Sequence, residues 1–205
     1  MKVLLINGSP RAKGNTSTAL AEVSRQLEKN GIDSEIVWIG NKPVRGCIAC
    51  NKCKQNPGAC VFNDDICNSI SDRFTECDAL IVGSPVYWGQ PNGALLSIIQ
   101  RAFYSNGANI AGKPVAAVAV CRRGGATASF ETLNMPFQMM NMPVVTSQYW
   151  NIVYGREPGQ AALDSEGMQT MRALANNMAW LLKATGGKPA PGRAGEDWEP
   201  MHFIR

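Results

Sequence analysis

Five short runs of strand-forming residues alternate with stretches of helical spacing along this chain, and this alternation constrains its fold more than any other feature. The expected strands lie at 2–6, 34–39, 79–84, 114–121 and 143–149. The expected helices lie at 16–29, 64–76, 94–104, 127–140 and 165–184. Because strands that alternate with helices form parallel pairs covered on both faces, the sequence predicts a doubly wound α/β fold with a five-stranded parallel sheet.

The strand–helix pattern continues without a linker, so residues 1–186 are expected to form one domain. A segment without regular spacing, 46–62, carries four of the cysteines. The C-terminal stretch 187–205 is rich in Pro and Gly, yet its Trp, Met, Phe and Ile residues are too apolar for a free tail. We expect this tail to pack on a second copy in a homodimer or homotetramer. The alternative is that it folds back on its own subunit.

Composition excludes several classes of function. The chain is 45% hydrophobic and 18% charged, as in a globular protein and unlike a disordered chain. Its net charge of +4 is too small to indicate nucleic-acid binding. No apolar run approaches the roughly 18 residues of a membrane span, so we expect a cytoplasmic protein with no membrane partner. Residues 1–60 contain nine Lys and Arg against four Asp and Glu, which favours an anionic ligand near the N-terminus.

Three loops are expected to meet at one edge of the sheet. Ligands of doubly wound sheets bind beyond the carboxyl ends of the strands. In this chain the loops at those ends are 7–16, 85–93 and 122–126. Residues far apart in the sequence therefore form one candidate site, and the chemistry of each loop indicates its ligand.

The first loop has the chemistry of a phosphate site. It leads into a helix N-terminus, whose free N–H groups and dipole bind anions. Ser9, Thr16 and Ser17 add hydroxyl donors, and Arg11 adds a positive charge. Neither the Walker sequence nor G-x-G-x-x-G is present, so the loop suits a terminal phosphate monoester that is held and not transferred. The alternative is a capped helix start with Asn15 or Thr16 as the N-cap.

The second loop contains two adjacent aromatic residues, Tyr87 and Trp88, where such loops are usually small and polar. These side chains would flank a flat ring, while backbone groups beside Gly89 meet its polar edge. The alternative is that both aromatic side chains cap the core or fill an oligomer interface.

The third loop contains Arg122, Gly124 and Gly125. The glycines permit close approach of the backbone, and the arginine suits a ring edge or a delocalised anion. The alternative is a basic turn on the surface. Taken together, the three loops describe a planar ring on a phosphorylated tail, which fits FMN.

Three segments resemble the NAD(P)H-dependent FMN reductases of the flavodoxin-like superfamily: GSPRAKGNT at 8–16, GSPVYWGQPN at 83–92 and FIR at 203–205. The resemblance covers nearly the full chain and implies a flavodoxin-like fold. It implies that five residues bind the FMN phosphate: Ser9, Arg11, Asn15, Thr16 and Ser17. It implies that five more surround the ring: Pro85, Val86, Tyr87, Trp88 and Gly89. The remaining candidates for cofactor binding are Asn92, Arg122, Gly124 and Gly125.

Four cysteines follow the pattern Cys47-x2-Cys50-x2-Cys53-x6-Cys60. Structural zinc usually takes two close pairs that lie farther apart, so this compact pattern is closer to iron–sulfur ligation. It resembles the four-cysteine motif of the iron–sulfur flavoproteins, which implies a [4Fe-4S] cluster beside FMN. The spacing also leaves open free or redox-active thiols and a zinc site.

These features predict an FMN-dependent oxidoreductase that passes electrons from NAD(P)H through FMN to an acceptor. The acceptor is a small molecule, such as a quinone, a flavin or a nitro compound, or an iron–sulfur centre or redox protein. The flavin supplies the chemistry, so no catalytic side chain is expected. Two alternatives remain: an electron carrier fed by ferredoxin, and a non-catalytic, metal-stabilised binding protein.

Overall fold

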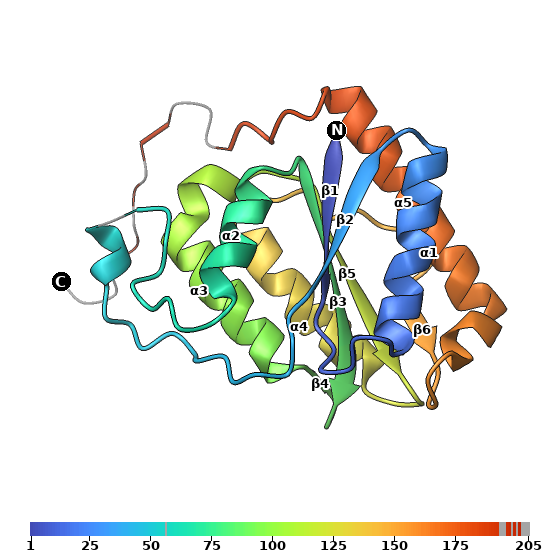
Figure 1. Cartoon of the computed structure of the whole chain (residues 1–205). Helices are drawn as coiled ribbons and strands as arrows, with labels where there is room; N and C mark the ends of the chain where they lie inside the picture. The colour runs from blue at the N-terminus through green and yellow to red at the C-terminus, as the bar shows by residue number, and fades with distance from the viewer. Residues whose placement is uncertain (56, 193–195, 198, 200, 202–205) are drawn as a thin grey trace.

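A computed structural model describes residues 1–55, 57–192, 196–197, 199 and 201 of the chain. A central sheet lies between two layers of helices (Figure 1). The strands are β1 (Lys2–Asn7), β2 (Asp33–Trp38), β3 (Ala79–Tyr87), β4 (Gln90–Pro91), β5 (Val115–Cys121) and β6 (Ile152–Tyr154). The helices are α1 (Asn15–Lys29), α2 (Cys67–Thr75), α3 (Gly93–Ile110), α4 (Ala126–Met139) and α5 (Ser165–Thr185). The short 3-10 helices are η1 (Lys52–Lys54) and η2 (Gln160–Leu163).

The main sheet has the strand order β2-β1-β3-β5-β6, and all of these neighbours are parallel. The two-residue β4 pairs antiparallel with the end of β3. This is the strand order of flavodoxin, in which the ligand binds where the order reverses between the first and third strands. The doubly wound, flavodoxin-like fold with five parallel strands that the sequence predicts is confirmed.

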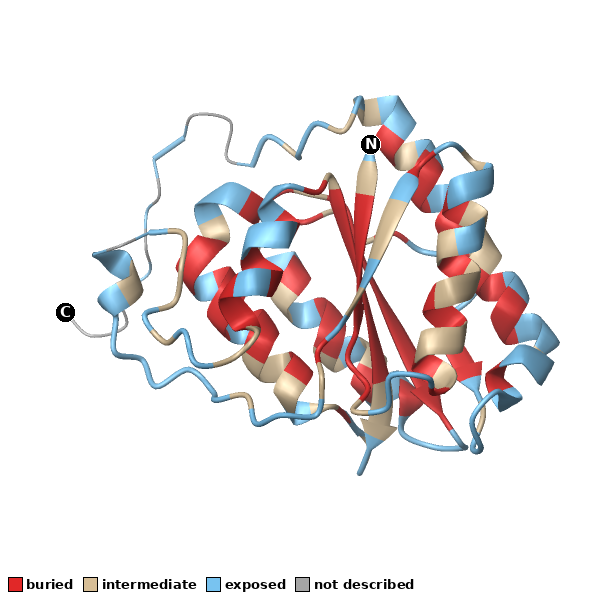
Figure 2. Ribbon diagram, in the orientation of Figure 1, coloured by how far each residue is buried: buried red, intermediate tan, exposed pale blue. Residues whose placement is uncertain are grey.

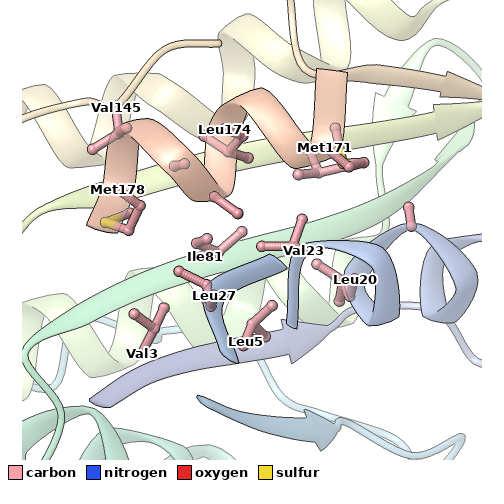
Figure 3. Packing of buried hydrophobic residues seen from close by; sticks show 14 of the residues in the cluster. Val3, Leu5, Leu20, Val23, Leu27, Ile81, Val145, Met171, Leu174 and Met178 are labelled. Carbon is pink, nitrogen blue, oxygen red and sulfur yellow. The ribbon is translucent and has the colours of Figure 1, made fainter. Parts of the chain in front are cut away.

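Alternate residues of each strand contribute to opposite halves of the core. Val3 and Leu5 of β1 belong to the cluster beneath α1 and α5, whereas Leu4 and Ile6 belong to the cluster beneath α2, α3 and α4. Buried residues concentrate in the sheet and on the helix faces turned toward it (Figure 2). In Figure 3 the apolar side chains of α1 and α5 meet over β1 and β3. The core thus fixes the strands, and with them the loops at their carboxyl ends.

The fifth parallel strand is β6, so the prediction of a strand at 143–149 is wrong. In the predicted run the described chain makes one isolated bridge, between Val144 and Val115 of β5. Residues 146–150 then leave the sheet and are mostly exposed. The loop that follows the last strand therefore begins at Gly155, directly beside the other edge loops.

Pairing with β5 resumes at Asn151, whose side chain is buried. Its Nδ2 donates to the carbonyl oxygen of Ala117 at 3.0 Å, and its own carbonyl accepts from the N–H of Ala119 at 2.9 Å. Because residues 146–150 leave the sheet, the carbonyl of Ala117 and the N–H of Ala119 in the fully buried β5 would otherwise lack partners. The bonds from Asn151 supply these partners. The run at 143–149 has the residues of a strand, but beyond Val115 it is the segment 151–155 that pairs with β5.

Two helices have boundaries that side-chain hydrogen bonds explain. α2 begins at Cys67 rather than 64, because the carboxylate of Asp65 accepts from the N–H of Cys67 at 3.0 Å and holds the preceding residues in a turn. α3 extends to Ile110, beyond the predicted end at 104. It is distorted at Asn106, whose side-chain amide donates to Ser71 Oγ of α2 at 2.9 Å.

The tail at 187–205 lies partly outside the described residues, including Trp198 and the FIR segment at 203–205. At its beginning the N–H of Ala190 donates to the carbonyl of Gly112 at 2.8 Å, so this part lies on its own chain. Packing of the tail on a second copy stays a prediction. Among the described residues, no helix combines the length and the apolar character needed to cross a bilayer.

Native-state hydrogen exchange tests the corrected fifth strand. The amides of 146–150 should exchange rapidly, whereas those of 116–120 in β5 should exchange only on global opening, because a buried ladder is protected. Slow exchange throughout 146–150 would instead support a continuous strand at 143–149.

Candidate functional site

β1 ends at Asn7 while its neighbour β3 runs on to Tyr87, and the candidate site opens beside these last residues of β3. Asn7 lies opposite Gly83 in the parallel register, and the N–H of Gly8 donates to the carbonyl of Gly83 at 2.8 Å. A Cβ atom at Gly8 would lie 2.8 Å from that carbonyl oxygen and 2.6 Å from the Leu95 side chain. Glycine at this position therefore lets the first loop leave the sheet against the neighbouring strand.

α1 begins behind this loop with Gly14 as its N-cap, and no side chain of the described chain caps it. The interpretation in which Asn15 or Thr16 is the cap is therefore wrong. The N–H groups of the first helical turn have no intrahelical partner and can bind an anion. Ser9 and Thr16 are 4% and 2% exposed, and Asn15 Oδ1 accepts from the N–H of Ala161 at 3.1 Å.

A cleft of about 210 Å³ lies between this loop and the loops after β3, β5 and β6. Eight of the predicted cofactor-binding residues line it: Ser9, Arg11, Asn15, Thr16, Pro85, Val86, Tyr87 and Arg122. A larger cavity of about 530 Å³ lies beside the end of β2, between residues 38–44 and 63–66. We take the smaller cleft as the candidate site because the hydroxyl and guanidinium groups meet there.

The cleft has one cationic end and one apolar wall. Arg11, Arg122 and Arg156 border it, and no carboxylate of the described chain is among its lining residues. With the free N–H groups of α1, these guanidinium groups favour an anion. Pro85 and Val86 at the end of β3 supply the apolar wall. This combination fits the phosphate and the ring of FMN.

The other six predicted residues, namely Ser17, Trp88, Gly89, Asn92, Gly124 and Gly125, lie outside the lining. Asn92 caps α3, with its Oδ1 accepting from the N–H of Ala94 at 2.8 Å. Trp88 and Gly89 form the turn of the β3–β4 hairpin with φ of 53° and 77°, the left-handed conformation that tight hairpin turns require. The Trp88 side chain is fully exposed at the tip of this hairpin.

The hairpin turn is held against the third loop by a contact between two glycines. A Cβ atom at Gly125 would lie 2.7 Å from Gly89 Cα and 3.1 Å from the Val86 side chain. Gly125 also has a φ of 84°, which side chains rarely adopt. Gly124 has open space around it. Glycine at position 125 therefore lets the third loop approach the hairpin closely.

Sequence analysis missed six residues of the lining: Gly14, Val120, Cys121, Gly155, Arg156 and Pro158. Three of them follow β6, and the sequence analysis selected no loop after the fifth strand. A Cβ atom at Gly155 would lie 2.8 Å from Asn15 Nδ2, so this glycine lets the last loop reach the first. Burial raises the pKa of the Cys121 thiol, which makes it a neutral part of the wall.

The four cysteines of the motif line a second, much smaller cavity of about 20 Å³. Cys47 and Cys50 are exposed, and Cys53 and Cys60 are half-buried. No three His, Cys, Asp or Glu of the described chain are placed to hold a metal ion. The four cysteines thus share one cavity, but those of the described chain are not arranged as a metal site.

The cysteine cavity has a buried cation in its wall. Arg101 of α3 is 1% exposed and pairs with Asp65 at 2.5 Å. Burial alone would raise the pKa of Asp65, but hydrogen bonds from Arg101 and from the N–H groups of Cys67 and Arg45 hold it below its usual value. Burial likewise opposes the charge of Arg101, yet its bonds to Asp65 and Cys60 raise its pKa, so it stays a cation.

Comparison with known proteins agrees with this geometry. The family model described as NADPH-dependent FMN reductase matches residues 1–157. An iron–sulfur flavoprotein of Methanocaldococcus jannaschii is 33% identical over 191 residues, which cover 89% of this chain and 98% of that protein. In fold, the chain is similar to RosB with a bound 8-demethyl-8-formylriboflavin-5'-phosphate intermediate (TM-score 0.72, 14% identity, 100% of this chain and 91% of that one). It is also similar to a flavodoxin from the domain Archaea (TM-score 0.61, 16% identity, 89% of this chain and 99% of that one).

The glycine contact gives a matched pair of variants. Gly125→Ala should weaken FMN binding and lower the melting temperature, because its Cβ displaces the hairpin and the left-handed backbone costs about 1–2 kcal/mol. Gly124→Ala should leave both quantities nearly unchanged. The measurements are flavin fluorescence titration and thermal unfolding, and equal effects of the two substitutions would contradict this account.

Proposed function

The chain belongs to the NADPH-dependent FMN reductase family, and we propose that it binds FMN in the edge cleft and passes electrons from NAD(P)H to an acceptor. One observation carries this proposal: the uncapped start of α1, with two buried hydroxyl groups beside it, faces an apolar wall across a single cleft. Bound FMN supplies the electron transfer itself. The chain supplies binding and orientation.

The phosphate end of the proposed site is formed by α1 and its loop. The backbone N–H groups of the first turn, with the hydroxyl groups of Ser9 and Thr16, donate to the phosphate oxygens. Arg11 and Arg156, which also line the cleft, add positive charge. Because these donors are fixed by the core and not by the ligand, little ordering is needed on binding.

The ring end of the proposed site is formed by the end of β3. Pro85 and Val86 exclude water from one part of the ring, and Tyr87 is 44% exposed at the rim of the cleft. Arg122 offers a guanidinium group to the polar edge. The cleft is open to solvent beside the exposed hairpin, which leaves access for a nicotinamide cosubstrate. The residues that line the cleft bind and position the ligand in this proposal.

We propose further that Cys47, Cys50, Cys53 and Cys60 hold a [4Fe-4S] cluster. The observation that favours it is the shared cavity of the four sulfur atoms, and the similar M. jannaschii protein is named an iron–sulfur flavoprotein. Thiolates are the usual ligands of such clusters. Protein prepared without oxygen should contain about four iron and four sulfide per chain. Zinc in place of iron, or metal-free thiols, would overturn the cluster.

Anaerobic reduction of the bound flavin tests the proposed electron donor. Under anaerobic conditions NADH or NADPH should bleach the flavin absorbance of the FMN-loaded protein within seconds, without ferredoxin. Bleaching only with reduced ferredoxin would favour an electron carrier over a reductase. Protein that takes up no FMN would contradict the proposal as a whole and support a non-catalytic binding protein.

Two substitutions test the proposed phosphate donors. Ser9→Ala with Thr16→Ala should weaken FMN binding by about tenfold or more, because each bond to a charged group contributes about 1.5–3 kcal/mol. Ser17→Ala is the matched control, since its hydroxyl lies outside the cleft lining and should change affinity little. Circular dichroism checks that the fold is intact. Equal losses for the control and the double variant would contradict the assignment.

A further inference from the structure

Cys60 differs from the other cysteines of the motif in how firmly it is held. Its backbone N–H donates to Asn68 Oδ1, and its carbonyl accepts from Asn68 Nδ2, both at 2.9 Å. Its Sγ accepts from Nε of Arg101 at 3.4 Å. Cys47 and Cys50, by contrast, are exposed. Cys60 is therefore a fixed point of the cavity.

The Arg101 guanidinium connects this fixed point to α3. One terminal nitrogen donates to Asp65 Oδ2 at 2.5 Å and to the carbonyl of Arg45 at 3.1 Å, and the other donates to the carbonyl of Phe62 at 3.0 Å. The remaining donor, the Nε–H group, bonds to the sulfur of Cys60. A buried arginine is rare and costly unless every donor is used. Here the planar group bonds to four residues, Arg45 in one chain segment and Cys60, Phe62 and Asp65 in another, which a lysine could not reach together.

We propose that Arg101 is a positioning residue that fixes Cys60 as the anchor of the four-cysteine site and raises the reduction potential of the cluster held there. This inference rests on the proposed cluster. A one-electron reduction adds a negative charge to the cluster and its sulfur ligands. A buried cation that donates to one of those ligands stabilises the reduced form, since hydrogen bonds to sulfur and nearby charge both set the potential. Asp65 opposes this effect, because it neutralises part of the charge of Arg101.

Two substitutions in the full-length protein test the proposal with opposite expected signs. Arg101→Lys removes the donor to Cys60 and should lower iron content per chain and shift the midpoint potential to more negative values. Asp65→Asn leaves Arg101 in place with its charge less compensated and should shift the midpoint to more positive values. Arg73→Lys is the control, since Arg73 is an exposed arginine paired with Glu35 on the surface.

Each protein is reconstituted without oxygen from ferrous iron and sulfide, assayed for both, and titrated with dithionite while the cluster signal is followed. FMN affinity and melting temperature report whether the fold survives. Wild-type protein that takes up no iron overturns the cluster and this inference with it. Iron-loaded wild type, with both variants keeping its iron content and midpoint, overturns the role of Arg101 alone. Shifts of the same sign in both variants would indicate a merely structural effect and also contradict the proposal.

Discussion

The parallel pairing of β1 with β3 is the constraint on which both the fold and the cleft depend. It sets Asn7 beside Gly83, so the first loop leaves the sheet against β3, whose last residues extend beyond the end of β1 to Tyr87. Packing of α1 over these strands then points its N-terminus at that place, where Gly83 leaves room for the helix. The start of α1 and the apolar end of β3 thus line one cleft as a consequence of this register.

α3 connects this cleft to the cysteine motif. It begins at Gly93, directly after the hairpin at the ring end of the cleft, and is capped there by Asn92. Arg101 lies eight residues farther on, about 12 Å along the helix axis, and holds Cys60. One rigid element therefore supports two sites of different chemistry, which can be altered separately.

The fold class was predictable because apolar runs and helical spacing are local signals, and five of each leave few other topologies. The loop before α1 was predictable for the same reason, since Ser9 and Thr16 flank the start of a helix; its role in phosphate binding is a proposal. The fifth strand was not, because the bonds that define it come from Asn151 to a strand more than 30 residues away. The loop after this strand, which contains Arg156, was not among the three loops that the sequence analysis selected. The role of Gly125 depends on contact with Gly89, which no local pattern encodes.

The affinity of the protein for FMN relative to riboflavin tests the central claim most directly. The two ligands share the ring, and only FMN has the phosphate that the start of α1 is proposed to bind. Two charge-assisted bonds of about 1.5 kcal/mol each correspond to about 100-fold tighter binding of FMN. Calorimetric titration of the flavin-free protein measures both constants. Riboflavin binding as tightly as FMN would contradict the assignment of the phosphate site and the account built on it.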